Sequence, residues 1–161
     1  MPLVGVVAKK RDIQAIKKEI KEKNIEIIEI TKESIKNLKN IKFEVIIFLQ
    51  NINLKEEEYK YMNGIISKTK CLIINGDIEI EILKNIEIEK TIKLITFGFN
   101  SKSTITISSV NEEKIIVFIQ RNIEKINGEV IESQEKQMIC SNNKKIYNNL
   151  AVFIIKELHN L

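Results

Sequence analysis

Leu72-Ile73-Ile74-Asn75-Gly76-Asp77 is an apolar run that ends in three residues suited to a turn. Such a run is typical of a strand that is buried on both faces of a parallel sheet. Similar runs precede it, and segments with apolar residues at helical spacing separate them. Strands are predicted over 3–8, 25–30, 43–49 and 70–75, and helices over 12–23, 32–38 and 55–68. This alternation predicts an α/β fold with a Rossmann-like parallel sheet and flanking helices over residues 1–90.

The pattern changes after Thr91. Further strands are predicted over 94–97, 114–120 and 137–140, and the run Thr104-Ile105-Thr106-Ile107-Ser108 alternates like a half-buried strand. Asn127-Gly128 is the strongest hairpin-turn signal in the chain. We therefore expect antiparallel strands and a β-hairpin region over residues 91–143.

A last helix is predicted over 144–161, packing back on the sheet. Apolar residues recur there at helical spacing, namely Ile146, Leu150, Phe153, Ile154 and Leu158. The stretch 78–85 fits a short helix, although its alternating Ile and Glu also suit a strand, and we favour the helix. No flexible linker interrupts the chain, so residues 1–161 are predicted to form a single domain.

Composition and charge point to a globular protein. The chain has 161 residues, 43% hydrophobic and 30% charged, with a net charge of +4. The basic excess lies in the first half, where lysine alternates with glutamate along helix faces. This pattern favours a solvated surface over a nucleic-acid patch.

Short apolar runs and early charges bear on location. The longest apolar runs fall far below the ~20 residues of a membrane span. Met1-Pro2-Leu3-Val4 leads within a few residues to Lys9-Lys10-Arg11, which does not fit a signal peptide. We expect a cytoplasmic protein without membrane insertion. Cys71 and Cys140 are not at metal-ligand spacing and are interpreted as buried reduced thiols.

Candidate ligand-binding residues follow two of the predicted parallel strands. Asn75 and Asp77 stand at the carboxyl end of the fourth strand, where open α/β sheets place ligands. A carboxylate there could hold a ribose hydroxyl or a metal, although a plain turn also fits the residues. Lys9 and Lys10, with Arg11, stand in the first βα turn, where a helix N-terminus could hold an anion; a solvated basic turn is the alternative.

Catalytic groups are harder to find. The single histidine, His159, lies two residues from the end and has no evident nucleophile or acid partner. Arg121 ends an apolar strand and is expected to pair with Glu132 or Glu135 across the hairpin. We predict no catalytic residues, no metal site and no cofactor.

Several of these motifs together resemble the latter part of the Mur ligase central domain. Asn75-Gly76-Asp77 is similar to that family's strand ending Asn-Ala-Asp-Asp, and Thr96-Phe97-Gly98 to its Thr-Phe-Gly strand. Tyr147-Asn148-Asn149-Leu150-Ala151 resembles its helix opening Tyr-Asn-x-x-Asn-Ala-Leu-Ala-Ala, and Phe48-Leu49-Gln50-Asn51-Ile52 its strand ending Thr-Asn-Ile. The resemblance covers about residues 43–161.

The same resemblance predicts a loss of activity. Family members bind ATP with a glycine-rich loop that contains Gly-Lys-Thr, and this chain has none. Asn53-Leu54 also stands where the family has Asp-His. Since phosphoryl transfer depends on positioned phosphates and Mg²⁺, ligase activity is not expected.

Two classes of function follow from these observations. The leading hypothesis is a non-catalytic, Mur-ligase-like domain that binds a protein or a ligand, with a possible link to cell-envelope metabolism. The alternative is a small enzyme or a nucleotide- or metabolite-binding sensor that uses the carboxyl ends of the parallel strands. Because the 104–108 strand is neutral and flat in pattern, its edge also predicts a homodimer. The alternative is that the 114–120 strand and the Asn127-Gly128 hairpin cover that edge, which would leave a monomer.

Overall fold

The computed structural model describes residues 1–21, 23–139 and 145–161. Its main feature is an eight-stranded sheet in the order β10-β7-β6-β5-β4-β3-β1-β2. The first five strands are β1 (Leu3–Val7), β2 (Glu26–Glu29), β3 (Val45–Phe48), β4 (Cys71–Asn75) and β5 (Lys93–Gly98). All five pair in parallel, which confirms the prediction for β1 to β4.

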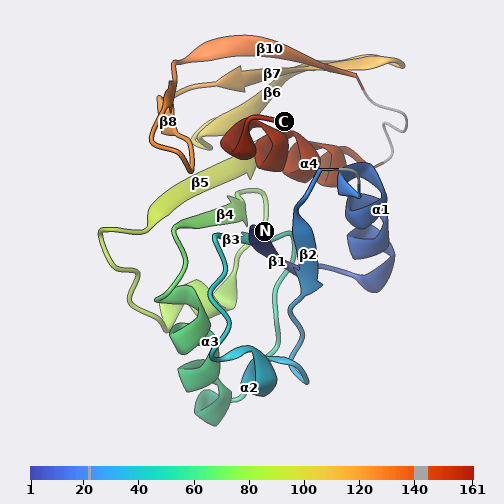
Figure 1. Cartoon of the computed structure of the whole chain (residues 1–161). Helices are drawn as coiled ribbons and strands as arrows, with labels where there is room; N and C mark the ends of the chain where they lie inside the picture. Colours follow the sequence, from blue (N-terminus) through green and yellow to red (C-terminus); the bar gives the residue numbers. More distant parts are fainter. Residues whose placement is uncertain (22, 140–144) are drawn as a thin grey trace.

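Helices cover both faces of this parallel part (Figure 1). On one face lie α1 (Lys10–Ile20) and α4 (Ile146–His159), which share a core cluster with alternate residues of the strands, such as Val6 and Ile73. On the other face lie α2 (Ile35–Leu38), α3 (Tyr59–Ile66) and the 3-10 helices η1 (Glu56–Glu58) and η2 (Glu81–Lys84). Successive strand residues point to opposite faces, so both sides of β3 and β4 are buried.

Local sequence explains where the helices begin. In α1, Ile13, Ile16 and Ile20 recur at helical spacing and are buried, while the lysines between them face solvent. Before α2, Thr31 and Ser34 exchange hydrogen bonds between backbone N–H and side-chain oxygen of 2.9 and 3.2 Å. These bonds close the turn that leads into α2, whose N-cap residue Ser34 makes no side-chain cap hydrogen bond. In the predicted 78–85 segment, η2 confirms the helical interpretation.

The remaining strands curl over α4. They are β6 (Ile105–Val110), β7 (Lys114–Ile119) and β10 (Gln134–Ile139), and Figure 1 shows α4 between them and the parallel strands. The helix is therefore buried almost all round, with Leu150, Ile155 and Leu158 at 1% exposure or less. The apolar residues of α4 cover more than one side of the helix, and such a helix is stable when it is packed between two layers. Phe153, which we placed in the core, is only half-buried and packs at its margin.

The antiparallel part is smaller than the range 91–143 that we predicted. β5 is parallel to β4, and β6 pairs in parallel with the end of β5 before it pairs antiparallel with β7. The parallel β5–β6 pairing needs no crossover helix, because only the last two residues of β5, Phe97 and Gly98, pair with the first two of β6. Thr104 donates its backbone N–H to the Thr96 hydroxyl oxygen at 2.9 Å, which sets the new strand beside the old one.

The edge that suggested a homodimer is largely covered. β6 pairs with β5 at its start and with β7 along its length, and a bulge between Ile107 and Ser109 interrupts the flat pattern. Bulges of this kind discourage edge-to-edge association. The edges of the large sheet are instead β2 and β10. The homodimer stays a prediction, but the reason given for it was wrong.

A second sheet holds only β8 (Ile123–Glu124) and β9 (Val130–Ile131), which form the hairpin predicted at Asn127-Gly128. Gly128 has φ +91, a conformation that favours glycine. Just before it, Arg121 corrects our expectation of an ion pair. Its guanidinium donates to the Lys102 carbonyl at 2.7 Å, and among the described residues it forms no salt bridge with Glu132 or Glu135.

Two other sequence expectations concern burial. Cys71 is fully buried and free, and burial raises the pKa of its thiol to about 12, although the charge of Lys93 opposes this. Cys140, and with it the end of the strand predicted over 137–140, lies outside the described residues.

In the described part of the chain, no helix has the length and apolar character needed to cross a membrane.

Candidate functional site

A cleft of about 590 Å³ opens at the carboxyl ends of β1, β3 and β4. Its position follows from the topology, because β1 lies between β2 and β3 and the chain leaves these strands toward opposite faces of the sheet. Ligands of open α/β sheets bind at such a switch point. The first turns of α1 and α4 complete the walls. The cleft is lined by Ala8, Lys9, Arg11, Asp12, Leu49, Gln50, Asn75, Ile78, Lys145, Ile146, Tyr147 and Asn148.

Positive charge dominates this cleft. Lys9, Arg11 and Lys145 line it, and Lys9 and Lys145 are the residues at which α1 and α4 begin. Within the described part of the chain, neither Lys9 nor Lys145 makes a side-chain cap hydrogen bond, so backbone N–H groups and the positive ends of two helix dipoles add to the charge. The one acid among the described lining residues is Asp12, whose carboxylate accepts a hydrogen bond from Asn148 at 3.0 Å. The cleft is therefore suited to an anion.

The two residues predicted at the end of β4 have structural partners. Asn75 is buried, and its carboxamide oxygen accepts the Asp77 backbone N–H at 3.0 Å. Its carboxamide nitrogen lies 3.4 Å from the Leu49 carbonyl oxygen, which ties the end of β4 to the end of β3. Asn75 thus shapes the floor of the cleft and presents little free hydrogen-bonding capacity to a ligand.

Asp77 fastens three segments together. Its carboxylate accepts the backbone N–H groups of Phe99 and Asn100, both at 2.7 Å, and the Tyr147 hydroxyl at 2.8 Å. We call this set of contacts the Asp77 latch. It joins the end of β4 to the loop after β5 and to the first turn of α4. A β-carbon at Gly98, where φ is +141, would collide with the Asp77 carboxylate, so the latch requires glycine there.

Tyr147 is the part of the latch that faces the cleft. Its ring lies 6.5 Å from that of Phe97 and 6.3 Å from that of Phe99, measured between centroids. Partial burial, together with the hydrogen bond to the Asp77 carboxylate and its negative charge, raises the pKa of the Tyr147 phenol to about 12. The neutral hydroxyl is thus the form that the fold favours.

This raised pKa predicts how stability depends on pH. Because the folded-state pKa of Tyr147 is about 12, above the ordinary value of 10.0, its stabilising effect should be complete below pH 10 and lost as the pH rises toward 12. We expect wild type to be more stable than Tyr147→Phe at neutral pH and the difference to shrink over that interval. Urea unfolding of both proteins checks this. A difference that stays constant to pH 12 would contradict the Asp77–Tyr147 contact.

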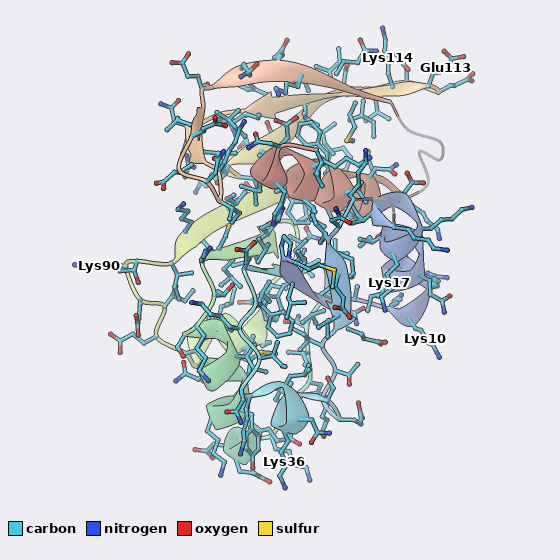
Figure 2. The ribbon with its side chains drawn as sticks, viewed as in Figure 1. Lys10, Lys17, Lys36, Lys90, Glu113 and Lys114 are labelled. Atoms are coloured by element: carbon cyan, nitrogen blue, oxygen red, sulfur yellow. The ribbon has the colours of Figure 1, made fainter. Side chains whose placement is uncertain are left out.

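The four predicted site residues are only partly brought together. Lys9 and Asn75 line the cleft. Asp77 is not a lining residue, and its carboxylate is engaged in the latch, where it accepts the Tyr147 hydroxyl. Lys10 is exposed on α1 and does not line the cleft; Figure 2 labels it beside Lys17 on the same helix. Lys10 follows Lys9 by one position, and each residue of a helix is rotated by about 100° from the one before it. The side chain of Lys10 therefore points away from the cleft.

Other lining residues were not predicted as site residues. Gln50 follows β3, so the rule about carboxyl ends of strands could have found it. Tyr147 and Asn148 belong to the helix opening that carried the family resemblance. Lys145 offered no signal, since only the packing of α4 beside α1 brings it to the cleft.

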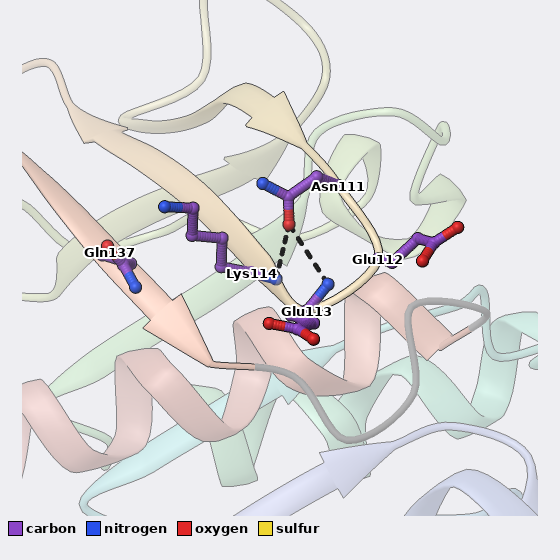
Figure 3. Close-up of a pocket in the computed structure, with 5 residues that line it drawn as sticks. All are labelled: Asn111, Glu112, Glu113, Lys114 and Gln137. Atoms are coloured by element: carbon purple, nitrogen blue, oxygen red, sulfur yellow. Dashed lines mark hydrogen bonds between the residues drawn. The ribbon is translucent and has the colours of Figure 1, made fainter.

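A second hollow, of about 540 Å³, lies at the turn between β6 and β7 (Figure 3). It is lined by Asn111, Glu112, Glu113, Lys114 and Gln137. The Asn111 carboxamide oxygen accepts the backbone N–H groups of Glu113 at 3.1 Å and Lys114 at 2.9 Å. These polar groups close a hairpin turn, whereas the cleft gathers groups from several strands and helices. The cleft is therefore the better candidate site.

Comparison with known proteins gives no assignment: no family model matches the chain, and no curated protein matches it significantly. The residues of the cleft are thus the basis for a functional proposal.

Proposed function

We propose that this chain is a non-catalytic binding domain that holds a small anionic metabolite in the cleft between the first turns of α1 and α4. The observation that carries the proposal is the convergence of Lys9, Arg11 and Lys145 at the switch point of the sheet. Among the described residues none of the three forms a salt bridge. Lysines elsewhere do, including Lys70 with Glu44 at 2.9 Å and Lys136 with Glu157 at 2.8 Å.

The electrostatics of the helix starts support an anionic ligand. A cation at a helix N-terminus opposes the helix dipole, typically by about 0.3–1 kcal/mol for each charge. Lys9 and Arg11 line the cleft at the start of α1, where Asp12 is the only acid of the first turn, so like charges lie close together there. A bound phosphate or carboxylate would offset this repulsion and would also accept hydrogen bonds from the uncapped backbone N–H groups.

The first βα turn argues against use of ATP. It reads Ala8-Lys9-Lys10-Arg11-Asp12 and contains no glycine, so the backbone cannot wrap closely around a triphosphate. A Mur-ligase-like ancestry remains part of the proposal, and its support is the order of motifs along residues 43–161. On that view the domain has kept a binding site at the same end of the sheet without the ATP loop, and a role in cell-envelope metabolism would follow from the ancestry.

Calorimetry with inorganic pyrophosphate at about 0.15 M ionic strength tests the proposal. Arg11→Ala and Lys145→Ala should each weaken binding about tenfold, because each removes a charge-assisted hydrogen bond. Lys17→Ala is the matched control, since Lys17 is exposed on the same helix and does not line the cleft. We expect it to change binding by less than about twofold, because distant exposed charges are screened. Equal losses in all three variants, or no binding to wild type at millimolar pyrophosphate, would overturn the proposal.

A parallel titration with Mg-ATP separates the two classes of function. We expect Mg-ATP to bind no more tightly than pyrophosphate. A dissociation constant near ~1 μM, which corresponds to ~8 kcal/mol, would instead favour the nucleotide-binding sensor.

A further inference from the structure

Two exposed apolar side chains flank the cationic cleft. Ile78 is 39% exposed and lines the cleft directly after the latch residue Asp77. Phe99 is 55% exposed, and its ring meets that of Tyr147 edge-on, at an interplanar angle of 87°. We call Ile78, Tyr147 and Phe99 the apolar rim. Exposed apolar side chains of this size, when they gather beside a cleft, indicate that apolar groups of a ligand bind there.

The backbone beneath the apolar rim is fixed by hydrogen bonds. The Asp77 carboxylate accepts the backbone N–H of Phe99 at 2.7 Å and the hydroxyl of Tyr147 at 2.8 Å. Ile78 is joined to Asp77 by the peptide bond. Each rim residue is thus anchored at the Asp77 latch or next to it in the chain, so fixing this part of the backbone on binding would require little additional entropy.

The interior of the cleft links this rim to the cations. Leu49 and Ile146 are half-buried apolar residues that line the cleft together with Ile78. Lys9, Arg11 and Lys145 supply the charged part of the lining. A ligand that filled the cleft would meet cations with one group and apolar surface with another.

We propose that the ligand of this cleft is an amphipathic anion, in which a phosphate or carboxylate group is attached to an apolar body. The anionic group lies against Lys9, Arg11 and Lys145, and the apolar body covers the rim. This inference rests on the proposed function, because it specifies the ligand class of the same site.

Methyl phosphate and hexyl phosphate form a matched pair of probes, since they carry the same charged group. In titrations followed by amide chemical shifts, hexyl phosphate should bind wild type at least about tenfold more tightly, because burial of about two methylene groups gives that factor. Phe99→Ser and Ile78→Ser should each lower the affinity for hexyl phosphate more than the affinity for methyl phosphate, and so remove most of this preference. Both side chains are largely exposed, and the backbone N–H of Phe99 remains available to Asp77.

Val130→Ser is the control variant. Val130 is also 55% exposed, but it lies on β9 and does not line the cleft, so this substitution should leave the preference for hexyl phosphate intact. Equal affinity of wild type for both phosphates would overturn the inference while the proposed function stands. A hexyl preference that survives both rim substitutions would also overturn it. If neither phosphate binds, the proposed function fails and the inference fails with it.

Discussion

Leu150→Ala should lower the free energy of unfolding by about 3–5 kcal/mol, near the upper part of the range for buried leucines. Leu150 is fully buried in α4, and that helix is enclosed by the parallel strands and by β6, β7 and β10. A cavity at this position would face packed structure on all sides, which leaves little freedom for neighbours to collapse into it. Chemical denaturation measures the effect.

Phe153→Ala and Leu94→Ala are graded controls for Leu150→Ala. Phe153 is half-buried at the margin of the same core. Although its side chain is larger, Phe153→Ala should therefore lower the free energy of unfolding by less than Leu150→Ala, by about 1–2 kcal/mol. Leu94 is 50% exposed on β5, so Leu94→Ala should lower the free energy of unfolding by less than about 0.5 kcal/mol. A larger loss at Phe153 than at Leu150 would contradict the placement of α4.

Asp77→Ala should destabilise the protein by about 2–4 kcal/mol, because it leaves three donors without their charged acceptor. The donors are the backbone N–H groups of Phe99 and Asn100 and the Tyr147 hydroxyl. Water reaches Phe99 and Asn100, which are exposed, so the loss falls short of the full sum for three such bonds. Urea unfolding gives the change.

Gly98→Ala provides an independent test of the same latch. Its new β-carbon would collide with the Asp77 carboxylate, so the substitution should also be destabilising. In the double variant the carboxylate is gone and the collision is relieved. The double variant should therefore lose less unfolding free energy than the two single variants lose in sum. The difference should exceed the ~0.5 kcal/mol that is expected for independent sites. Additive effects would show that Asp77 does not lie against Gly98.

The parallel half of the fold could be predicted because its signals are local. Runs such as 43–49 and 70–75 are apolar throughout, and the helical spacing of Ile13, Ile16 and Ile20 fixes the inner face of α1. The later strands could not be placed in the same way. Whether β5 pairs in parallel with β4, and how β6 starts beside it, depends on long-range hydrogen bonds such as that between Thr104 and Thr96.

The site was predictable only as far as it follows from strand ends. Lys9 and Asn75 were found because each stands at the end of a parallel strand. The same rule selected Asp77, but it could not show that the carboxylate would be engaged by a loop and by α4. The sequence could not identify Lys145 as a site residue. This residue comes to the cleft through packing between helices that are more than a hundred residues apart in sequence.

Amide chemical shifts of the wild-type protein during titration with inorganic pyrophosphate test the central claim most directly. We predict saturable shifts concentrated at residues that line the cleft, in the first turn of α1, at Gln50 and in the first turn of α4. Shifts concentrated instead at the β6–β7 turn, or spread evenly over exposed lysines such as Lys36 and Lys90, would contradict it.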